Sequence, residues 1–159
     1  MKNQLSEGKD YDLWRLLANT RAVIFKVREK ELSQYGITPQ QAGILHILQT
    51  TGDKVTIAHI SRLTFRELHT VLGLVNRMEK TGLVRKVKDS GNKNVIRVSL
   101  TGKGRGVYYQ SINRESIYQI LSSLSEEEQR QLSSFLGKLL NKACKLLQAS
   151  GKPFLPLSE

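Results

Sequence analysis

Apolar residues recur at three- and four-residue spacings along most of the chain, which is the pattern of amphipathic helices. Within 10–35 the apolar residues at these spacings include Leu13, Leu16, Leu17, Val23, Ile24 and Val27. Gly36 follows them, and glycine readily adopts the left-handed conformation that ends a helix. The pattern therefore predicts one long helix near the start of the chain.

A second helix is predicted directly after this glycine, because residues 38–41 are Thr-Pro-Gln-Gln. Thr is a good N-cap, Pro suits the first helical position, and Gln at the third position completes a capping box. The apolar residues Ile44, Leu45 and Leu48 share one face of this helix, which should stop near Gly52.

Two more helices are expected in close succession. Thr56 can cap a short one whose inward positions are Ile57, Ile60 and Leu63. After a turn at Thr64-Phe65, a fourth helix should run from about Arg66 to Thr81 and end at Gly82. Its expected core face consists of Leu68, Val71, Leu74, Val75 and Met78.

A β-hairpin is predicted next. In the segments 83–88 and 95–100, apolar and polar residues alternate or β-branched residues follow one another, which is typical of short strands. The polar segment 89–94 between them is expected to form the turn. Thr101 then opens a single fifth helix that bears Val107, Tyr108, Ile112, Ile117, Ile120 and Leu121. Ser125 and Glu128 form another capping box, which starts a sixth helix that Gly151 and Pro153 end.

This order predicts a mainly α fold with a small β-hairpin wing, a winged helix-turn-helix. In such a fold the second of two short helices enters the major groove of DNA and the first braces it. We expect a single domain over 1–159, with a DNA-binding lobe at 37–104. The flanking helices at 10–35 and 102–149 are strongly apolar on one face, so we expect them to form a homodimer interface.

The charge of the chain supports a polyanionic partner. The formal net charge is +11, and residues 53–105 hold twelve Lys and Arg against four Asp and Glu. A concentrated basic segment binds phosphates with release of counterions. A solvated basic surface would have the same composition, so charge alone leaves the two interpretations open.

Other features favour the cytoplasm. No run of about 18 apolar residues predicts a membrane span, and the first ten residues lack the apolar stretch of a signal peptide. Cys144 is the single cysteine, which excludes an intrachain disulfide. Its position beside the apolar stripe of the last helix favours inert packing, with a redox switch promoted by Lys142 and Lys145 as the alternative.

Over about residues 10–148, the order of these predicted elements resembles that of the multiple-antibiotic-resistance regulator (MarR) family. The matching segments are ITPQQAGIL at 37–45, LVNRMEKTGLV at 74–84, and Asp89 followed by RVSLTGKG at 97–104. The resemblance implies a homodimeric transcriptional regulator, commonly a repressor. It also implies a small aromatic acid as ligand, bound between the dimerisation region and the DNA-binding lobes.

The chain departs from the family pattern at two places that contact DNA. Asn92, Lys93 and Asn94 stand where the family usually has acidic-Arg-Arg chemistry at the wing tip. The recognition helix opens Arg66-Glu67-Leu68-His69-Thr70 rather than with small hydroxyl residues and Lys. An operator preference is therefore not transferable from the family.

Candidate DNA contacts lie opposite the core stripe of the fourth helix, on a wheel of about 100° per residue. They are Arg66, His69, Gly73, Asn76, Arg77 and Lys80, with Thr70 at the margin of this face. Arg reads guanine and Asn reads adenine in the major groove, so His69, Asn76 and Arg77 should discriminate bases, with Arg66 at the entrance. Leu72 flanks Gly73 and is a candidate for contact with a thymine methyl. Taken alone, this face would be an ordinary solvated one.

The wing adds Arg85, Lys86, Lys88, Lys93 and Arg97. We expect these to lie near phosphate, which positions a protein without specifying sequence. Charges that protect an edge strand are the alternative for one or two of them. Arg85 and Lys86 are consecutive, so they should point to opposite faces of the strand.

The expected dimer interface centres on two apolar stripes, Leu13, Leu16 and Leu17 near the N-terminus and Phe135, Leu136, Leu139, Leu140 and Leu147 on the last helix. A two-fold dimer presents two recognition helices, so the operator should be an inverted repeat with half-sites about one helical turn apart. Tyr11, Trp14, Tyr108 and Tyr109 are candidates for the ligand cleft, with interface packing as the alternative.

The sequence indicates no enzyme, cofactor or metal site. His46, His59 and His69 lie on three different predicted helices without the close spacing of zinc ligands. The glycine-rich segment 102–106 lacks the spacing of a phosphate-binding loop, so a nucleotide-binding protein is a distant alternative. A helical interaction module without DNA binding is another, although it leaves the basic wing unexplained.

Overall fold

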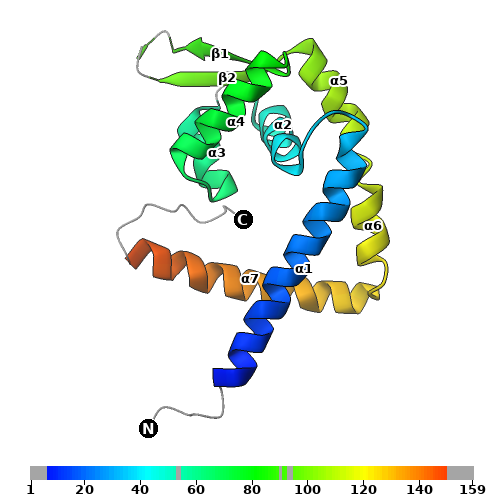
Figure 1. The fold of residues 1–159 in the computed structure, drawn as a ribbon. Helices are drawn as coiled ribbons and strands as arrows, with labels where there is room; N and C mark the ends of the chain where they lie inside the picture. The colour runs from blue at the N-terminus through cyan, green and yellow to red at the C-terminus, as the bar shows by residue number, and fades with distance from the viewer. Residues whose placement is uncertain (1–6, 53–54, 90, 93–94, 150–159) are drawn as a thin grey trace.

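A computed structural model describes residues 7–52, 55–89, 91–92 and 95–149. The elements are α1 (Glu7–Ser33), α2 (Pro39–Thr51), α3 (Ile57–Thr64), α4 (Leu68–Lys80), β1 (Val84–Lys88), β2 (Ile96–Leu100), α5 (Gly102–Ser111), α6 (Glu115–Leu121) and α7 (Glu126–Ala149). In Figure 1 a lobe of α2, α3, α4 and the hairpin lies at the top, while α1, α6 and α7 extend below it. This is the predicted winged helix-turn-helix with additional long helices.

Local capping chemistry sets the starts of the helices in the lobe. Thr38 accepts a hydrogen bond from the Gln41 N–H (3.3 Å), and the Gln41 side chain accepts one from the Thr38 N–H (2.9 Å). Thr56 likewise accepts from the His59 N–H at 3.1 Å. Both predicted caps are confirmed, and Gly36 adopts the positive φ (67°) expected after α1.

The hairpin is antiparallel, with Val84 paired to Leu100 and Lys88 paired to Ile96. A hydrogen bond from the Val98 N–H to the Val55 carbonyl oxygen (2.8 Å) attaches β2 to the segment that precedes α3. The buried core lies among α2, α3, α4 and the hairpin, and it includes Ile44, Leu45, Leu48, Ile60, Val71, Val75, Met78, Val84 and Val98. The wing is therefore anchored to both helices of the helix-turn-helix.

Gly104 allows α5 to start directly against the base of the wing. A Cβ atom at this position would lie 1.9 Å from the Leu83 carbonyl oxygen, far inside van der Waals contact. Thr101 caps the helix by accepting from the Gly104 N–H (3.0 Å), and it donates to the Gly82 carbonyl oxygen (2.6 Å). The glycine-rich segment 102–106 thus has a packing role at this junction.

The prediction that Leu68 belongs to the core is wrong. Leu68 is 54% exposed, whereas Val71, Leu74, Val75 and Met78 are buried as predicted. The helix begins at Leu68 rather than near Arg66, because left-handed Phe65 (φ 53°) and extended Glu67 take up the turn. Leu68 therefore lies at the rim of the lobe.

The expectation of one continuous helix after Thr101 is also wrong. α5 ends at Ser111 and α6 begins at Glu115, because Arg114 adopts a left-handed conformation with φ of 50°. Arg28 on α1 donates to the Ser111 carbonyl oxygen at 2.7 Å, which gives this freed acceptor a partner. The break lets α5 pack on α2 while α6 packs on α1.

The last helix starts as predicted, since Ser125 and Glu128 exchange the two hydrogen bonds of a capping box. Its predicted end at Gly151 and Pro153 lies outside the described residues. Within the part of the chain that the structure describes, no helix is long and apolar enough to cross a membrane.

Candidate nucleic-acid interface and ligand cleft

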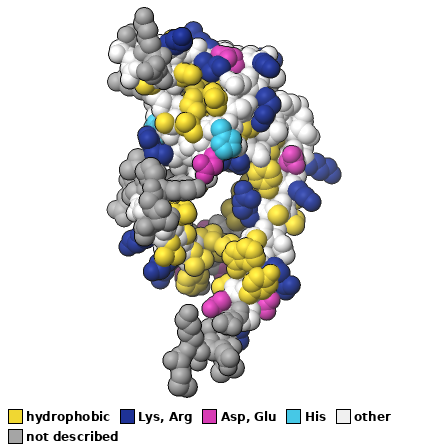
Figure 2. Space-filling model, turned by 60° about the vertical axis from the view of Figure 1, so that its left-hand side comes forward, with side chains coloured by type: hydrophobic (Ala, Val, Ile, Leu, Met, Phe, Trp, Pro, Cys, Tyr) yellow, Lys and Arg dark blue, Asp and Glu magenta, His cyan; other side chains and the backbone are white. Residues whose placement is uncertain are grey.

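The face of α4 opposite the core is open to solvent. His69 and Arg77 are exposed, and Thr70, Gly73 and Asn76 are half-buried. Arg66 lies in the turn before α4, where its carbonyl oxygen accepts from the Ser61 hydroxyl at 2.6 Å. On the face shown in Figure 2, Lys and Arg side chains lie around apolar ones on the lobe. The predicted base-contacting residues thus share one accessible surface.

Lys86 joins the wing to this surface. Its Nζ donates to Asn76 Oδ1 at 2.7 Å and lies 3.0 Å from Glu79 Oε2. Its backbone N–H donates to Glu79 Oε1 at 2.9 Å, which is the main reason the pKa of Glu79 lies below its ordinary value. The ammonium of Lys86 is therefore held by α4, an arrangement that strand alternation alone did not predict.

A second ion pair shapes the wing. Arg97 Nε donates to Asp89 Oδ2, and Asp89 Oδ1 accepts from the backbone N–H groups of Gly91 (2.7 Å) and Asn92 (3.1 Å). The Gly91 hydrogen bond is the largest cause of a lowered pKa at Asp89, followed by that of Arg97. Arg97 thus holds the hairpin turn while its side chain remains 38% exposed.

The other wing cations differ in their surroundings. Lys88 is exposed at the end of β1. Arg85 donates to the Ser99 hydroxyl at 3.0 Å, on the opposite face of the strand from Lys86, as predicted. Lys93 lies outside the described residues.

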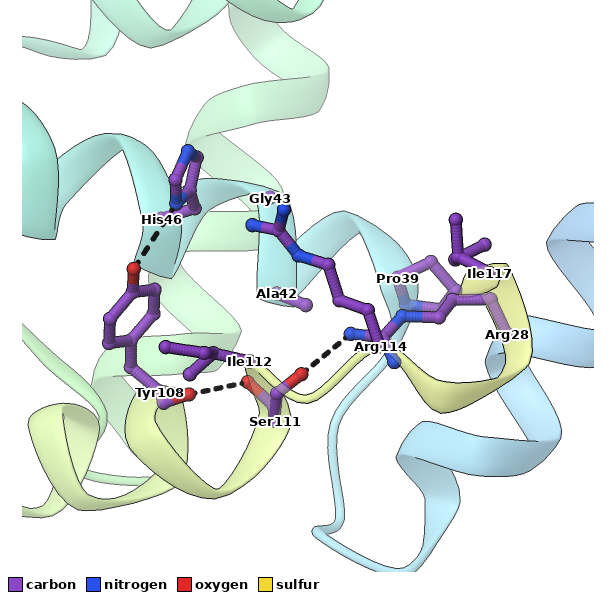
Figure 3. Close-up of a pocket in the computed structure, with 10 residues that line it drawn as sticks. All are labelled: Arg28, Pro39, Ala42, Gly43, His46, Tyr108, Ser111, Ile112, Arg114 and Ile117. Atoms are coloured by element: carbon purple, nitrogen blue, oxygen red, sulfur yellow. Dashed lines mark hydrogen bonds between the residues drawn. The ribbon is translucent and has the colours of Figure 1, made fainter. Parts of the chain in front are cut away.

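A cavity of about 230 Å³ lies between α1, α2 and the α5–α6 junction (Figure 3). Its polar lining comes chiefly from Arg28, His46, Tyr108 and Arg114. His46 Nδ1 and the Tyr108 hydroxyl are hydrogen-bonded at 3.3 Å across its rim. Neither arginine was predicted at this site. Arg114 is brought beside α2 only by the break before α6.

The four aromatic residues expected in one cleft do not meet. Only Tyr108 lines this cavity. Tyr109 packs edge-on against Tyr108, with ring centroids 5.3 Å apart. Tyr11 and Trp14 contact each other near the start of α1, with ring centroids 5.6 Å apart, and belong to another part of the protein.

A mostly buried ion pair supports the cavity from α1. Arg28 Nη1 lies 2.6 Å from Glu31 Oε2, and the two side chains are 12% and 15% exposed. The Ser116 hydroxyl at the start of α6 donates to the same carboxylate. Burial would raise the pKa of Glu31, but the hydrogen bonds from Ser116 and Arg28 outweigh it and lower the pKa.

An apolar groove of about 530 Å³ separates α1 from α7. It is lined by six of the eight residues expected at the dimer interface, namely Leu13, Leu16, Leu17, Phe135, Leu136 and Leu139. Leu140 and Leu147 are also exposed on α7. In this single chain, two long helices therefore present a contiguous uncovered apolar surface.

The histidines lie apart, on α2, α3 and α4. Among the described residues, no group of three or more His, Cys, Asp or Glu is placed to hold a metal ion. Cys144 is buried on α7.

Comparison with known proteins decides the family. A model of the MarR family matches residues 35–93. The HTH-type transcriptional regulator YsmB of Bacillus subtilis (strain 168) is 31% identical over 130 residues, which cover 80% of this chain and 88% of YsmB. The chain belongs to the MarR family. It is therefore a DNA-binding transcriptional regulator, in a family of regulators rather than enzymes.

Other similar proteins agree with this assignment. PecS of Dickeya dadantii (strain 3937), an HTH-type transcriptional regulator, is 24% identical over 127 residues, covering 77% of this chain and 76% of PecS. The organohalide-sensing regulator RdhR-CbdbA1625, solved with 2,4-dichlorophenol bound, is 28% identical with a TM-score of 0.85, covering 100% of this chain and 96% of that one.

A mutant MarR from E. coli, solved with operator DNA, has the same fold. Its TM-score is 0.78 at 18% identity, and the match covers 87% of this chain and 99% of that one.

Proposed function

We propose that this MarR-family protein is a homodimeric repressor that binds an inverted-repeat operator in double-stranded DNA and is released by a small aromatic ligand. The observation that carries the proposal is the open face of α4, where Asn76 is held in place by Lys86 on the adjacent wing strand. A preorganised amide beside exposed His69 and Arg77 suits recognition of base edges in the major groove.

We assign the contacts within each half-site by position. His69, Asn76 and Arg77 discriminate bases, and Arg66 stands at the entrance. Gly73 lies nearest the groove floor, with Thr70 at the margin of this face. Lys88, Lys93 and Arg97 contact phosphate or the adjacent minor groove. Lys86 contacts phosphate while its ammonium stays bound to Asn76 and Glu79.

Two copies associate through α1, α5, α6 and α7, with residues 37–104 of each copy forming the DNA-binding lobe. The groove between α1 and α7 supports this division, because its leucines are 38–63% exposed in the single chain. Burial of this apolar area between two copies would stabilise the dimer by about 25 cal/mol per Å². The two-fold axis of such a dimer would present two α4 helices to the two halves of an inverted repeat.

The cavity between α1, α2 and α5 is the proposed ligand site. Its arginines suit a carboxylate or phenolate, and its apolar wall of Ala42, Ile112 and Ile117 suits a ring. It lies between a proposed dimerisation helix and the winged lobe, so an occupant would change how the two parts are held. The similar RdhR-CbdbA1625, solved with a chlorinated phenol, supports this ligand class.

Selection of bound sequences from a random DNA pool tests the core of the proposal. We expect an inverted repeat with half-site centres about 10 base pairs apart, bound by two chains. Light scattering should give a dimer at micromolar concentration, whereas a monomer contradicts the proposed assembly. Benzoate and 2,4-dichlorophenol are probes for the cavity, and either should raise the unfolding temperature of the wild type more than that of Arg114→Ala.

A further inference from the structure

Three large apolar side chains in and just before the first turns of α4 are exposed to solvent. Leu68 is 54% exposed, Leu72 is 37% exposed, and Phe65 in the preceding turn is 36% exposed. Single exposed apolar residues are common on proteins. Leu68 and Leu72, however, lie one turn apart on the helix proposed to enter DNA, and Phe65 lies in the turn that precedes it.

Their positions are continuous with the polar contacts proposed above. At about 100° per residue, Leu72 lies about 40° from Leu68 and about 60° from His69 around α4. Asn76 lies between Leu72 and His69 on the same wheel. The apolar strip, defined here as Leu68 and Leu72, therefore lies between the buried face of α4 and the base-reading side chains. Leu68 is about 60° from buried Val71, and Leu72 is about 40° from Asn76.

Gly73 gives an independent reason to expect close approach of DNA here. An interior helical glycine costs about 1 kcal/mol relative to alanine. A Cβ atom at Gly73 would have as its nearest neighbour the flexible Nη1 of Arg77, at 3.8 Å. Nothing within the described chain excludes a side chain at this position, so an external surface accounts for its absence better than packing does.

Thymine presents the apolar group that such a strip would meet. In the major groove its C5-methyl is the distinctive apolar feature of the base edges. The nearby cations Arg66, Arg77 and Lys80 favour a polyanion over an apolar protein surface as the occupant. We propose that Leu68 and Leu72 contact thymine methyl groups, so that each operator half-site requires thymine beneath the start of α4.

This inference rests on the proposed function, and it is tested on the operator that the pool selection yields. Each thymine of one half-site is replaced in turn by deoxyuridine, which removes only the methyl group. For the wild-type protein, one or two replacements should weaken binding about threefold to tenfold, as expected for one buried methyl. Leu72→Ala or Leu68→Ala should bind the normal and substituted operators equally at the matching position.

Lys88→Ala is the matched control, since it should weaken binding to every operator while keeping the same deoxyuridine profile. The wild-type scan needs no variant, so it decides the question even where a substitution impairs folding. If no deoxyuridine replacement weakens wild-type binding, or if both leucine variants keep the full sensitivity, the inference is wrong. Failure of the pool to yield any preferred sequence would instead refute the proposed function itself.

Discussion

Lys86 Nζ on β1 donates to Asn76 Oδ1 on α4 at 2.7 Å, while Glu79 lies 3.0 Å from the same ammonium. The contact joins the wing to the recognition helix through side chains that were expected to bind phosphate and base separately. Because Asn76 Oδ1 already accepts from Lys86, the side-chain NH₂ of Asn76 is left to donate toward the groove. We therefore propose that Lys86 positions Asn76 for base recognition.

Replacing Lys86 with Met should therefore lower specificity as well as affinity. We expect a loss of about 1–2 kcal/mol on the selected operator, with reduced discrimination at the base pair that Asn76 contacts. Lys88→Met is the matched control on the same strand, and it should weaken specific and random DNA alike. Fluorescence anisotropy on operators varied at that base pair measures both effects. Equal, sequence-independent losses for the two variants would show that Lys86 only neutralises phosphate.

Gly104→Ala should strongly destabilise the protein, because the added Cβ would lie 1.9 Å from the Leu83 carbonyl oxygen. Backbone must shift to relieve this contact, so we expect a loss of at least about 2–3 kcal/mol in the free energy of unfolding. Gly106→Ala in the same helix meets nothing within 4 Å and should be neutral or slightly stabilising. Urea unfolding at one fixed protomer concentration compares them, and equal stabilities for the two variants would disprove the close packing.

Glu31 should make stability depend on pH in the acid range. Its pKa is lower in the folded protein than its ordinary value of 4.5, since the hydrogen bonds from Ser116 and Arg28 outweigh burial. A lowered folded pKa means that its contribution is present above about pH 4.5 and is lost as the pH falls through the folded pKa. Glu31→Gln should cost about 1–3 kcal/mol at pH 7, and less as the pH approaches 3.

The measurement is the free energy of unfolding of the wild type and Glu31→Gln between pH 7 and pH 3. Glu29→Gln, on the exposed side of α1, controls for the loss of one formal charge. A difference between wild type and Glu31→Gln that stays constant over this pH range would contradict the assigned role of the carboxylate.

Local chemistry explains why much of the fold could be predicted. The capping boxes at Thr38 and Ser125, and the cap at Thr56, depend on residues within three positions of one another, and all three are present. The helix-turn-helix and the hairpin are bounded by such caps and by polar turns. The order of these elements could therefore be predicted from local sequence alone.

Features that depend on contacts between residues far apart in the chain could not be predicted from the sequence. The break at Arg114 has neither Gly nor Pro beside it, and it lies where Arg28, 83 residues away from Ser111, supplies a donor. The contact between Lys86 and Asn76 depends on how β1 lies over α4. The cavity between α1, α2 and the α5–α6 junction depends on the same break, which explains why its arginines were not predicted and why only Tyr108 of the four candidate aromatic residues lines it.

The central claim is that α4 reads bases while the wing supplies general attraction to phosphate. The most direct test is a salt titration of binding for Arg77→Ala and Lys88→Ala on the selected operator and on random DNA. We predict that Arg77→Ala loses about 1–3 kcal/mol on the operator and much less on random DNA. Lys88→Ala should weaken both alike and reduce the salt slope by about one. Equal losses on both DNAs for Arg77→Ala, with an operator-specific loss for Lys88→Ala, would contradict the account.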